Sequence, residues 1–578
     1  MAIGAAVVVD IGRPGVVRRH VPKHAVHDEM KRFDRAVTLA AQGLREVNER
    51  VRTTAPRAES SILEAYVAMV EDETLREDIE RRVKIDRQCI EWAVDAAVGE
   101  MARQLKSGGD PYLAERSHDL EFIGDMLQRT LTGRQRSLSV PDLGEPAIVV
   151  AHDLSPAETA GLSRDRVLAM VTEIGTRTSH TAILARSLEI PAVVGVSGIL
   201  SHVGSGDRLI VDGLRGRVVI GPTPEMIDAA QARAERHRVL AQGLREQSGR
   251  PASTKCGVPI SLRANIELPS EADIALSEGA QGIGLYRTEF LYVNRALPPS
   301  EEEQYQTYKS VLERVGPLPV TLRTFDIGGD KFSSAFPAPP EMNPALGLRA
   351  VRLGLARPDI FLEQLRAMVR ASAHGQLNIM VPMIAAVQEL RAVRGLLDRA
   401  IAEVDKAGHK RAAKIPLGVM VEVPAAAIMA HELAREAEFL SIGTNDLIQY
   451  SLAVDRTSRE LAYLASPYDP AILRLIRGVI EAGRRHQRPV AVCGAMASDP
   501  IPSLLLIGMG LRELSMESSA LPEVKEAISR VTLAEAEAAA SRALEAVTTE
   551  DVASAMGAAF HARVSDLLGS DDLPSGTG

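Results

Sequence analysis

The sequence predicts a multidomain α/β protein: a helical bundle lies within or next to a small α/β domain, and a (β/α)8 barrel follows. Three observations support this fold class. The chain has 578 residues, and at one to two hundred residues per domain this length corresponds to about three to five domains. Residues 27–133 repeat apolar side chains at helical spacing, between short β-rich runs. After residue 256, strand-like runs alternate with helical patterns.

Composition limits the class of protein. Hydrophobic residues make up 46% of the chain and charged residues 25%, which is typical of globular proteins and excludes a disordered or collagen-like chain. The formal net charge of −9 provides no overall basic field to hold a polyanion, and aromatic residues make up only 3%. Both features argue against nucleic acid as a main partner.

The cysteines and the N-terminus indicate a cytoplasmic protein. Cys89, Cys256 and Cys493 lie far apart, so they form neither a disulfide framework nor a zinc-ligand pattern, and a reducing setting fits best. The first apolar run is broken by Asp10 and Gly12 and lacks a basic leader, so it predicts a first strand rather than a signal peptide. The sequence contains no run of about 18 apolar residues, so it predicts no membrane-spanning helix.

The region after this strand predicts four helices. Their apolar residues recur at intervals of three and four residues. The first stretch begins at Met30, and the others are Ser60–Val83, Ile85–Leu105 and Tyr112–Leu131. The pattern fits an antiparallel bundle or two helical hairpins. Periodicity alone leaves two roles open, a spacer or dimerisation coil and a docking site.

A compact α/β domain and a linker come next. Short apolar runs at residues 146–151, 167–171, 208–212 and 218–220 predict strands, and residues 181–189 predict a helix between them. Residues 226–249 are charged and rich in alanine, which is typical of a solvated helix. The polar stretch 247–254 contains Gly249 and Pro251 and is the best linker in the chain.

The remaining region predicts the barrel. Helical patterns, including Glu301–Val315, Asp359–Ala373, Val387–Lys406 and Pro470–Arg485, separate most of the strand-like runs. Those runs end near Asn265, Arg287, Arg323, Pro382, Glu422, Gly443, Cys493 and Glu517. Strands and helices that alternate in this way fit a (β/α)8 barrel, with a doubly wound sheet as the alternative.

Charged and polar side chains and one thiol gather where these predicted strands end, which is where barrels carry their chemistry. The set comprises Arg287, Arg323, Arg456, Glu422, Asn445, Asp446 and Cys493. Arginine forks suit phosphate and carboxylate, and two carboxylates with an amide suit Mg²⁺. The expected ligand is a small phosphorylated carboxylate, with a thiol nearby that could exchange a proton at carbon.

His180 is the candidate phosphoryl acceptor. It lies in a segment from Gly175 to Arg186 that follows an apolar strand and opens a helix. An anion there would meet free N–H groups and the positive end of the helix dipole, and a neutral imidazole could attack phosphorus. The alternative is a histidine that caps the helix with a structural hydrogen bond.

Four motifs, taken together, resemble Enzyme I of the bacterial phosphotransferase system, the phosphoenolpyruvate–protein phosphotransferases. They are residues 178–187 (TSHTAILARS), 284–292 (GLYRTEFLY), 326–331 (DIGGDK) and 441–450 (SIGTNDLIQY). The resemblance runs nearly end to end and is weakest in the helical region and the final dozen residues. It implies a phosphohistidine domain, a phosphoenolpyruvate-binding barrel and a first step in sugar phosphotransfer.

The resemblance also implies residue roles. His180 would be phosphorylated on Nε2, and Cys493 would protonate the departing enolate to give pyruvate. Glu422 and Asp446 would bind Mg²⁺. The implied phosphoenolpyruvate ligands are Arg287, Arg323, Asn445, Asp446 and Arg456, with Arg349 lining the site. The implied partners are phosphoenolpyruvate, an HPr-like histidine phosphocarrier bound by the helical region, and a second copy bound through the barrel.

The expected domains follow from the pattern and the resemblance together. They are residues 1–22 with 134–225 (phosphohistidine domain), 23–133 (carrier-binding helices), 226–256 (helical linker), 257–566 (barrel and dimerisation domain) and 567–578 (disordered tail). His180 and the barrel fall in different domains, so the α/β domain is expected to swing about the linker near Gly249 and Pro251.

Two departures from the family pattern stand next to key residues. Thr176 replaces the second glycine before the histidine motif, and Ala495 replaces a glutamate after Cys493-Gly494. Three rival interpretations remain: a pyruvate phosphate dikinase or phosphoenolpyruvate synthase, a regulatory paralogue with weak transfer, and a nitrogen-branch Enzyme I. The first would need an ATP-binding domain, and the chain has no phosphate-loop motif.

Overall fold

The computed structural model forms two compact units that divide between Arg238 and Val239, and each is described by itself. The described residues are 1–9, 16–54, 66–67, 69–107, 111–132, 145–154, 165–175, 181–182, 185, 190–213, 215–246, 248–292, 297–328, 343–455 and 461–567. His180, Thr176, Arg456 and most of the predicted helix 181–189 lie outside them, as do residues 568–578 of the predicted tail.

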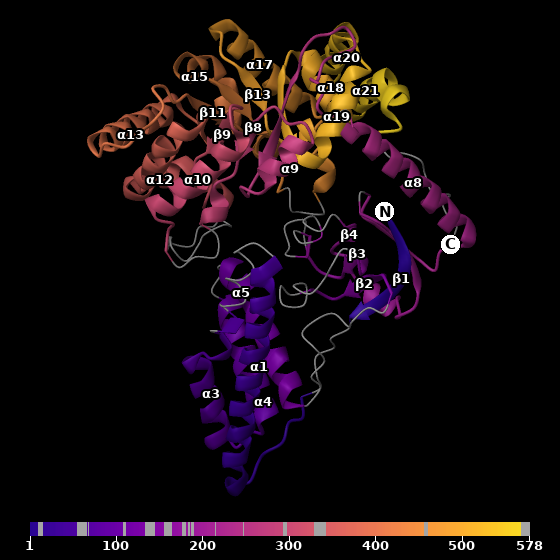
Figure 1. Ribbon diagram of the computed structural model, residues 1–578, viewed down its shortest axis with the longest axis vertical. Coiled ribbons are helices and arrows are strands. Elements are labelled where there is room, and N and C mark those ends of the chain that lie inside the picture. The colour runs from indigo at the N-terminus through magenta and orange to yellow at the C-terminus, as the bar shows by residue number, and fades with distance from the viewer. Residues whose placement is uncertain are drawn as a thin grey trace. The chain divides into compact units, whose positions relative to one another are not determined.

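The first unit contains a six-stranded sheet with the order β4-β3-β2-β1-β5-β6. Its strands are β1 (Ala2–Val9), β2 (Ala147–Ala151), β3 (Val167–Thr172), β4 (Ala192–Val193), β5 (Arg208–Asp212) and β6 (Arg217–Ile220). β1 pairs in parallel with β2, with Ala6 opposite Ile148. These neighbours are separated in sequence by the whole helical region, so the bundle is inserted into the α/β domain, as predicted (Figure 1). The sequence missed the short β4.

The inserted bundle contains α1 (Val26–Thr54), α3 (Glu73–Lys84), α4 (Ile90–Ser107) and α5 (Pro111–Leu131). Its core includes Phe33, Leu44 and Val94, all fully or almost fully buried. The predicted single helix Ser60–Val83 is wrong. Asp72 has an extended backbone and its side chain accepts a hydrogen bond from Leu75 N, so it begins a new helix at Glu73. The predicted helical run from Ile85 is also too long, because α4 begins at Ile90.

The charged linker helix is α8 (Pro224–Glu246), and the division between the units falls within it. Ala230, toward its start, is fully buried. Leu244, near its end, belongs to the apolar core of the barrel unit. The helix therefore contributes to both units.

The second unit is a closed parallel barrel with the order β10-β11-β12-β13-β14-β7-β8-β9. Its strands are β7 (Ser261–Ile266), β8 (Ile283–Tyr286), β9 (Val320–Arg323), β10 (Leu377–Val381), β11 (Leu417–Val421), β12 (Leu440–Ile442), β13 (Val490–Val492) and β14 (Glu513–Glu517). Each ends within about one residue of the predicted position. The alternative of a doubly wound sheet is wrong, because β14 pairs with β7 and closes the ring.

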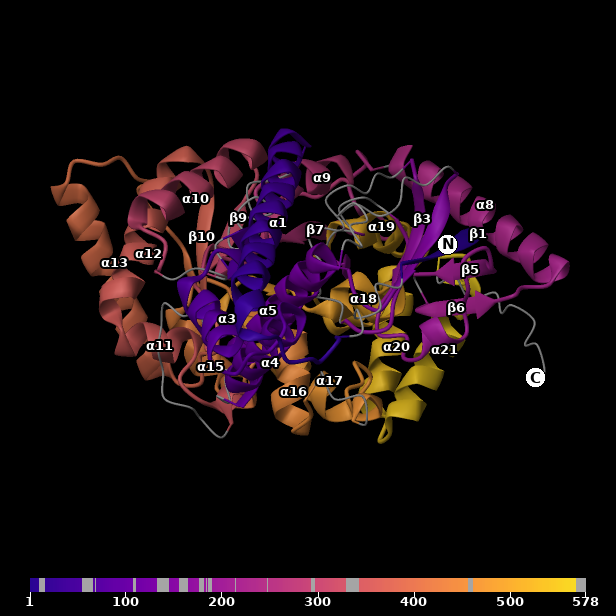
Figure 2. The same cartoon turned by 90° about the horizontal axis from the view of Figure 1, so that it is seen from below.

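Helices surround the barrel strands (Figure 2). They are α9 (Glu271–Ser277), α10 (Glu301–Val315), α11 (Ala350–Ala356), α12 (Pro358–Ala371), α13 (Val387–Lys406), α14 (Pro424–Ile428), α15 (Ala430–Glu436), α16 (Thr444–Leu452), α17 (Pro470–His486), α18 (Pro500–Met509), α19 (Leu521–Ser529), α20 (Leu533–Glu545) and α21 (Thr549–Val564). α10 begins at a capping box in which Ser300 and Glu303 bond reciprocally. Within the described part of the chain, no helix has the length and apolar character to cross a membrane.

Candidate functional site

The predicted site residues of the barrel that the structure describes lie at the carboxyl ends of its strands. Cys493 directly follows β13, and Asn445 and Asp446 lie in the first turn of α16 after β12. Arg287 follows β8, Arg323 ends β9 and Glu422 follows β11. Arg349 precedes α11, in the connection between β9 and β10. The barrel therefore brings to one face residues that span more than two hundred positions of sequence.

Two buried arginines share a carboxylate at this face. Arg323 Nη1 lies 3.4 Å from Asp326 Oδ2 and its Nη2 lies 3.1 Å from Glu289 Oε1. Arg349 Nη2 lies 2.8 Å from Asp326 Oδ1. Burial alone would disfavour both guanidinium charges. The pKa of each arginine is nevertheless raised, because Glu289 and Asp326 face Arg323 and Asp326 faces Arg349. Both arginines are therefore fixed cations whose charge is balanced before any ligand arrives.

Glu422 is the most enclosed carboxylate of the predicted set, with 1% of its surface exposed. Its Oε1 accepts a hydrogen bond of 2.6 Å from Met383 N. Burial raises the pKa of Glu422 well above its ordinary value, and repulsion from Asp446 and Asp326 adds to this. A divalent cation held by these carboxylates would relieve the same repulsion.

The donor set fits Mg²⁺. No group of three or more His, Cys, Asp or Glu side chains forms a metal cage within the described residues. Two carboxylates would leave the other positions of an octahedral ion to water and to substrate oxygens, which is how Mg²⁺ is commonly held in phosphoryl-transfer sites. The resemblance implies that Glu422 and Asp446 would hold the ion, and this assignment stays a prediction.

Cys493 is a buried thiol among apolar neighbours. It is 4% exposed and packs with Leu285, Met380 and Met420. Its Sγ donates to Ile442 O at 3.7 Å. Burial raises the pKa of Cys493 to about 11, with a further contribution from the nearby charge of Glu422. The thiol therefore holds its proton at neutral pH, which suits an acid and not a nucleophile.

The departure at Ala495 lies in a turn that positions Asn445. Ala495 N donates to Asn445 Oδ1 at 2.9 Å. The preceding Gly494 is required by close packing, because a Cβ there would lie 1.8 Å from Thr444 Oγ1. The contact to Asn445 comes from the backbone of residue 495, so the change of side chain leaves the amide in place.

Arg287 differs from the other two described arginines. Its side chain is 38% exposed and forms an ion pair with Glu267. Its charge lowers the pKa of Cys493, against the dominant effect of burial. Arg287 therefore acts electrostatically on the same thiol, and its ion pair with Glu267 is made through Nη1, one end of a guanidinium with five N–H donors.

A charged pair lies at the carboxyl edge of the sheet in the first unit. His152 follows β2 and Glu173 follows β3, and His152 Nδ1 lies 2.7 Å from Glu173 Oε2. Glu173 Oε1 also accepts from Leu200 N at 3.3 Å. Gly175 has φ of 117°, a left-handed conformation that favours glycine. These contacts hold the turns that follow β2 and β3, and His180 itself lies outside the described residues.

Sequence reasoning missed Glu289, Asp326 and Tyr450 as members of the barrel site. Tyr450 accepts from Arg349 Nη1 at 2.9 Å and donates to Ala345 O at 2.6 Å. All three stand in the motifs that carry the family resemblance, at residues 284–292, 326–331 and 441–450. A signal was present for the two acids: each follows a predicted strand end by about three residues. Nothing in the sequence alone indicated which arginine each acid would contact.

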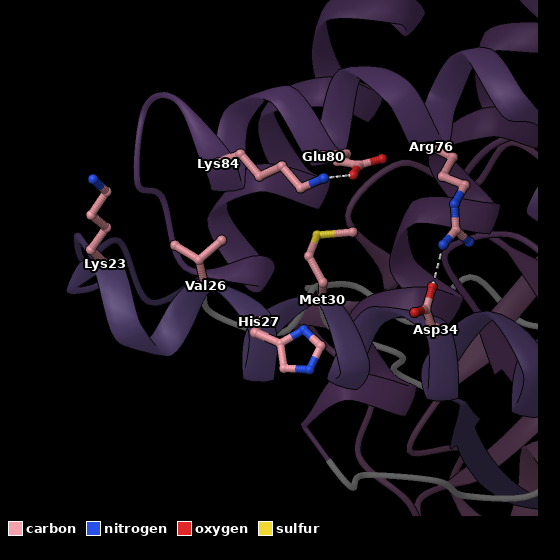
Figure 3. Close-up of a pocket in the computed structure, with 8 residues that line it drawn as sticks. All are labelled: Lys23, Val26, His27, Met30, Asp34, Arg76, Glu80 and Lys84. Carbon is pink, nitrogen blue, oxygen red and sulfur yellow. Dashed lines mark hydrogen bonds and ion pairs between the residues drawn. The ribbon is translucent and has the colours of Figure 1, made fainter.

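A separate hollow of about 390 Å³ lies in the helical bundle (Figure 3). Its lining comprises Lys23, Val26, His27, Met30, Asp34, Arg76, Glu80 and Lys84. Both acids are occupied by ion pairs, Asp34 with Arg76 at 2.6 Å and Glu80 with Lys84. The lining of the hollow includes carboxylates and an arginine but no thiol, so it differs from the barrel face in the group that could supply a proton to carbon.

The chain matches three family models of one class. The N-terminal domain of the PEP-utilising enzymes matches residues 1–116, their mobile domain matches 143–216, and their PEP-binding domain matches 241–533. The fold and the barrel site therefore fall in the class of PEP-utilising enzymes. The last match contains all the predicted site residues of the barrel.

Individual relatives are more specific. A "Phosphoenolpyruvate-protein phosphotransferase" of Bacillus sp. (strain S) is 40% identical over 536 residues, which is 92% of each chain. A protein of the same name from Staphylococcus aureus is 39% identical over 91% of this chain and 92% of its own. An NMR structure of an Enzyme I protein is 32% identical and covers 41% of this chain and 95% of that one, with a TM-score of 0.36. The chain belongs to the phosphoenolpyruvate–protein phosphotransferase family.

Proposed function

We propose that this enzyme takes a phosphoryl group from phosphoenolpyruvate onto His180, releases pyruvate, and passes the group to the histidine of an HPr-like phosphocarrier. The observation that supports this most directly is the buried cluster at the barrel mouth, where Arg323 and Arg349 lie with Glu422 and the protonated thiol of Cys493. This combination suits an anion with a phosphate, a carboxylate and a carbon that must gain a proton.

The arginines bind and orient the substrate. Arg323 and Arg349, with Arg287, Arg456, Asn445 and the turn at Asp446, spread the charge of the phosphate and carboxylate groups. Phosphoryl transfer passes through a loose transition state, so positioning and charge neutralisation supply most of the catalysis. Mg²⁺ held by Glu422 and Asp446 would supply further neutralisation of phosphate charge when bound.

Cys493 completes the reaction. The P–O bond of the substrate breaks, a P–N bond forms to His180, and the substrate leaves as the enolate of pyruvate. The enolate carbon takes the proton of the Cys493 thiol, and the thiolate regains a proton from water. Protonation makes the step hard to reverse, since the enolate is no longer present to attack the phosphohistidine.

The expected domain boundaries form part of this proposal. His180 belongs to the first unit and the barrel site to the second, so transfer requires that they meet. The helical domain, residues 23–133, would then present the carrier to the same histidine. The linker with Gly249 and Pro251 is the proposed hinge.

The barrel is also the proposed dimerisation domain. Leu346 lies in the connection after β9 and is 62% exposed. Ile428 follows β11 and is 70% exposed, and Tyr463 follows α16 and is 77% exposed. Large apolar side chains on neighbouring connections at one face fit a surface covered by a second copy. The three free cysteines fit the reducing cytoplasm.

The test uses phosphoenolpyruvate labelled in its phosphate, with and without Mg²⁺, on the wild type and on His180→Ala. We expect Mg²⁺-dependent label that is acid-labile and base-stable, as for a phosphohistidine, and no label on the variant. A wild type that binds phosphoenolpyruvate without taking label would identify a regulatory paralogue, and Thr176 and Ala495 would then be the residues to revert.

A further inference from the structure

Asp326 bridges the two buried arginines of the barrel mouth. Each of its carboxylate oxygens serves a different guanidinium: Oδ2 faces Arg323 Nη1 at 3.4 Å and Oδ1 faces Arg349 Nη2 at 2.8 Å. Asp326 is 3% exposed and both arginines are 6% exposed. The bridge is therefore shielded from water and salt, where an ion pair depends strongly on its geometry.

The bridge is itself held in place. Asp326 N donates to Glu289 Oε1 at 2.6 Å, and that same oxygen faces Arg323 Nη2. The backbone that carries Asp326 also packs tightly against Arg349. A Cβ on Gly328 would lie 2.1 Å from Arg349 Cβ, and Ala350 N donates to Ile327 O at 2.8 Å. The connection after β9 thus fixes both ends of the Asp326–Arg349 pair.

A neutral isostere cannot reproduce this bridge. An asparagine at position 326 would have one oxygen to accept from one arginine, and its NH₂ group would face the donors of the other. One guanidinium would then lose its contact with residue 326 and be held only by its other partner, Glu289 for Arg323 or Tyr450 for Arg349. The isostere also removes a negative charge next to the anion site, which by itself would strengthen the binding of an anion. The loss of positioning therefore predicts weaker binding of the substrate anion, whereas the loss of negative charge predicts tighter binding for the same substitution.

We propose that Asp326 is a positioning residue that holds Arg323 and Arg349 in the arrangement needed to bind and transfer the substrate phosphate. This inference rests on the proposed function. Asp326 acts through the arginines and does not touch the substrate. Its contribution lies in their orientation and outweighs the favourable effect that loss of its charge would have.

The test is Asp326→Asn, measured for phosphoenolpyruvate affinity by calorimetry and for kcat/KM of self-phosphorylation next to the wild type. We expect weaker substrate binding and a loss of about 10²-fold in kcat/KM, typical of misplaced binding groups. Equal or tighter binding with unchanged kcat/KM would overturn the inference. An inactive wild type would instead overturn the proposed function, so the two failures are distinguishable.

A double variant separates positioning from general damage. In an Arg349→Ala background the competing guanidinium is gone, so the single amide oxygen that Asp326→Asn leaves can serve Arg323. Adding Asp326→Asn there should cost less than about 3-fold, far below its cost in the wild type, since coupled residues are not additive. Full additivity would contradict the proposal.

A matched control is Glu513→Gln, which breaks a partly buried ion pair of 2.8 Å with Arg263 at the start of β14. It should change the melting temperature without changing phosphoenolpyruvate affinity. If Asp326→Asn does not fold, Asp326→Glu replaces it: the charge remains but the carboxylate shifts by one methylene. A wild-type affinity and kcat/KM for that folded variant would equally overturn the proposal.

Discussion

The barrel mouth and the sheet edge of the first unit hold charge in different ways. At the mouth, the side chains of Arg323 and Asp326 are 7% and 3% exposed and every described guanidinium faces a carboxylate. At the sheet edge, the side chain of His152 is 64% exposed in its pair with Glu173. A site that binds a highly charged small anion benefits from cations fixed in advance. An exposed pair at a sheet edge is screened by water and holds its groups less firmly.

The largest expected effect is at the mouth. Glu422→Gln removes a carboxylate charge from the proposed Mg²⁺ site but keeps the acceptor for Met383 N. We expect at least about 10²-fold slower self-phosphorylation, partly recovered at high Mg²⁺. The measurement is the initial rate across a Mg²⁺ titration. Glu438→Gln, which breaks an ion pair with Arg394 at 2.9 Å, is the control. The same rate at every Mg²⁺ concentration for the two variants would contradict the assignment of Glu422 as a metal ligand.

The next effect concerns the proton at Cys493. Cys493→Ser replaces the thiol by a hydroxyl of similar size that is a weaker acid, and we expect pyruvate release to slow by about 10²-fold or more, the usual contribution of a positioned acid. The protonated thiol is the active form and its pKa is raised to about 11, so ionisation of Cys493 should not limit the rate below about pH 10. The measurement is the pH–rate profile of pyruvate formation. An alkaline limb near pH 8 that disappears in the serine variant would contradict this assignment.

A smaller effect is expected at the sheet edge. Glu173→Gln weakens the pair with His152, whose hydrogen bond holds the pKa of Glu173 below its ordinary value. The pair is exposed and water can replace it, so we expect a loss of only a few-fold in phosphorylation rate. The double variant with His152→Ala should be no slower than Glu173→Gln alone. A loss as large as that of Glu422→Gln would remove the contrast between the two regions.

The smallest effect on activity is expected from alkylation of Cys256. This exposed thiol accepts from Leu533 N at 3.4 Å and lies 3.2 Å from Thr254 Oγ1, and these hydrogen bonds lower its pKa. Iodoacetamide should label Cys256 well before the buried Cys89 and Cys493. Peptide mass spectrometry gives the order of labelling. Singly labelled protein should keep its activity, whereas inactivation at that stage would place Cys256 in the mechanism.

Local pattern was sufficient for much of the fold. Most barrel strands are short, largely apolar runs followed by polar or glycine residues, so their ends follow from the sequence, as at Arg323 and Cys493, whereas β7 and β14 alternate polar and apolar residues. The helical region was harder. Apolar periodicity continues through Asp72, and only the hydrogen bond of this cap to Leu75 N shows that a helix begins there. Apolar periodicity indicates which face of a helix is buried, but it does not indicate where one helix ends and the next begins.

The sequence by itself determined the order of elements, the family and the residue types available for chemistry, because these depend on neighbouring positions and recognisable motifs. Only the tertiary structure decided which charges meet. Asp326 bridges arginines at positions 323 and 349, and Ala495 N contacts Asn445 across fifty positions. Such pairings arise where strand ends converge, and an ion pair's strength depends on distance and burial that no one-dimensional pattern contains.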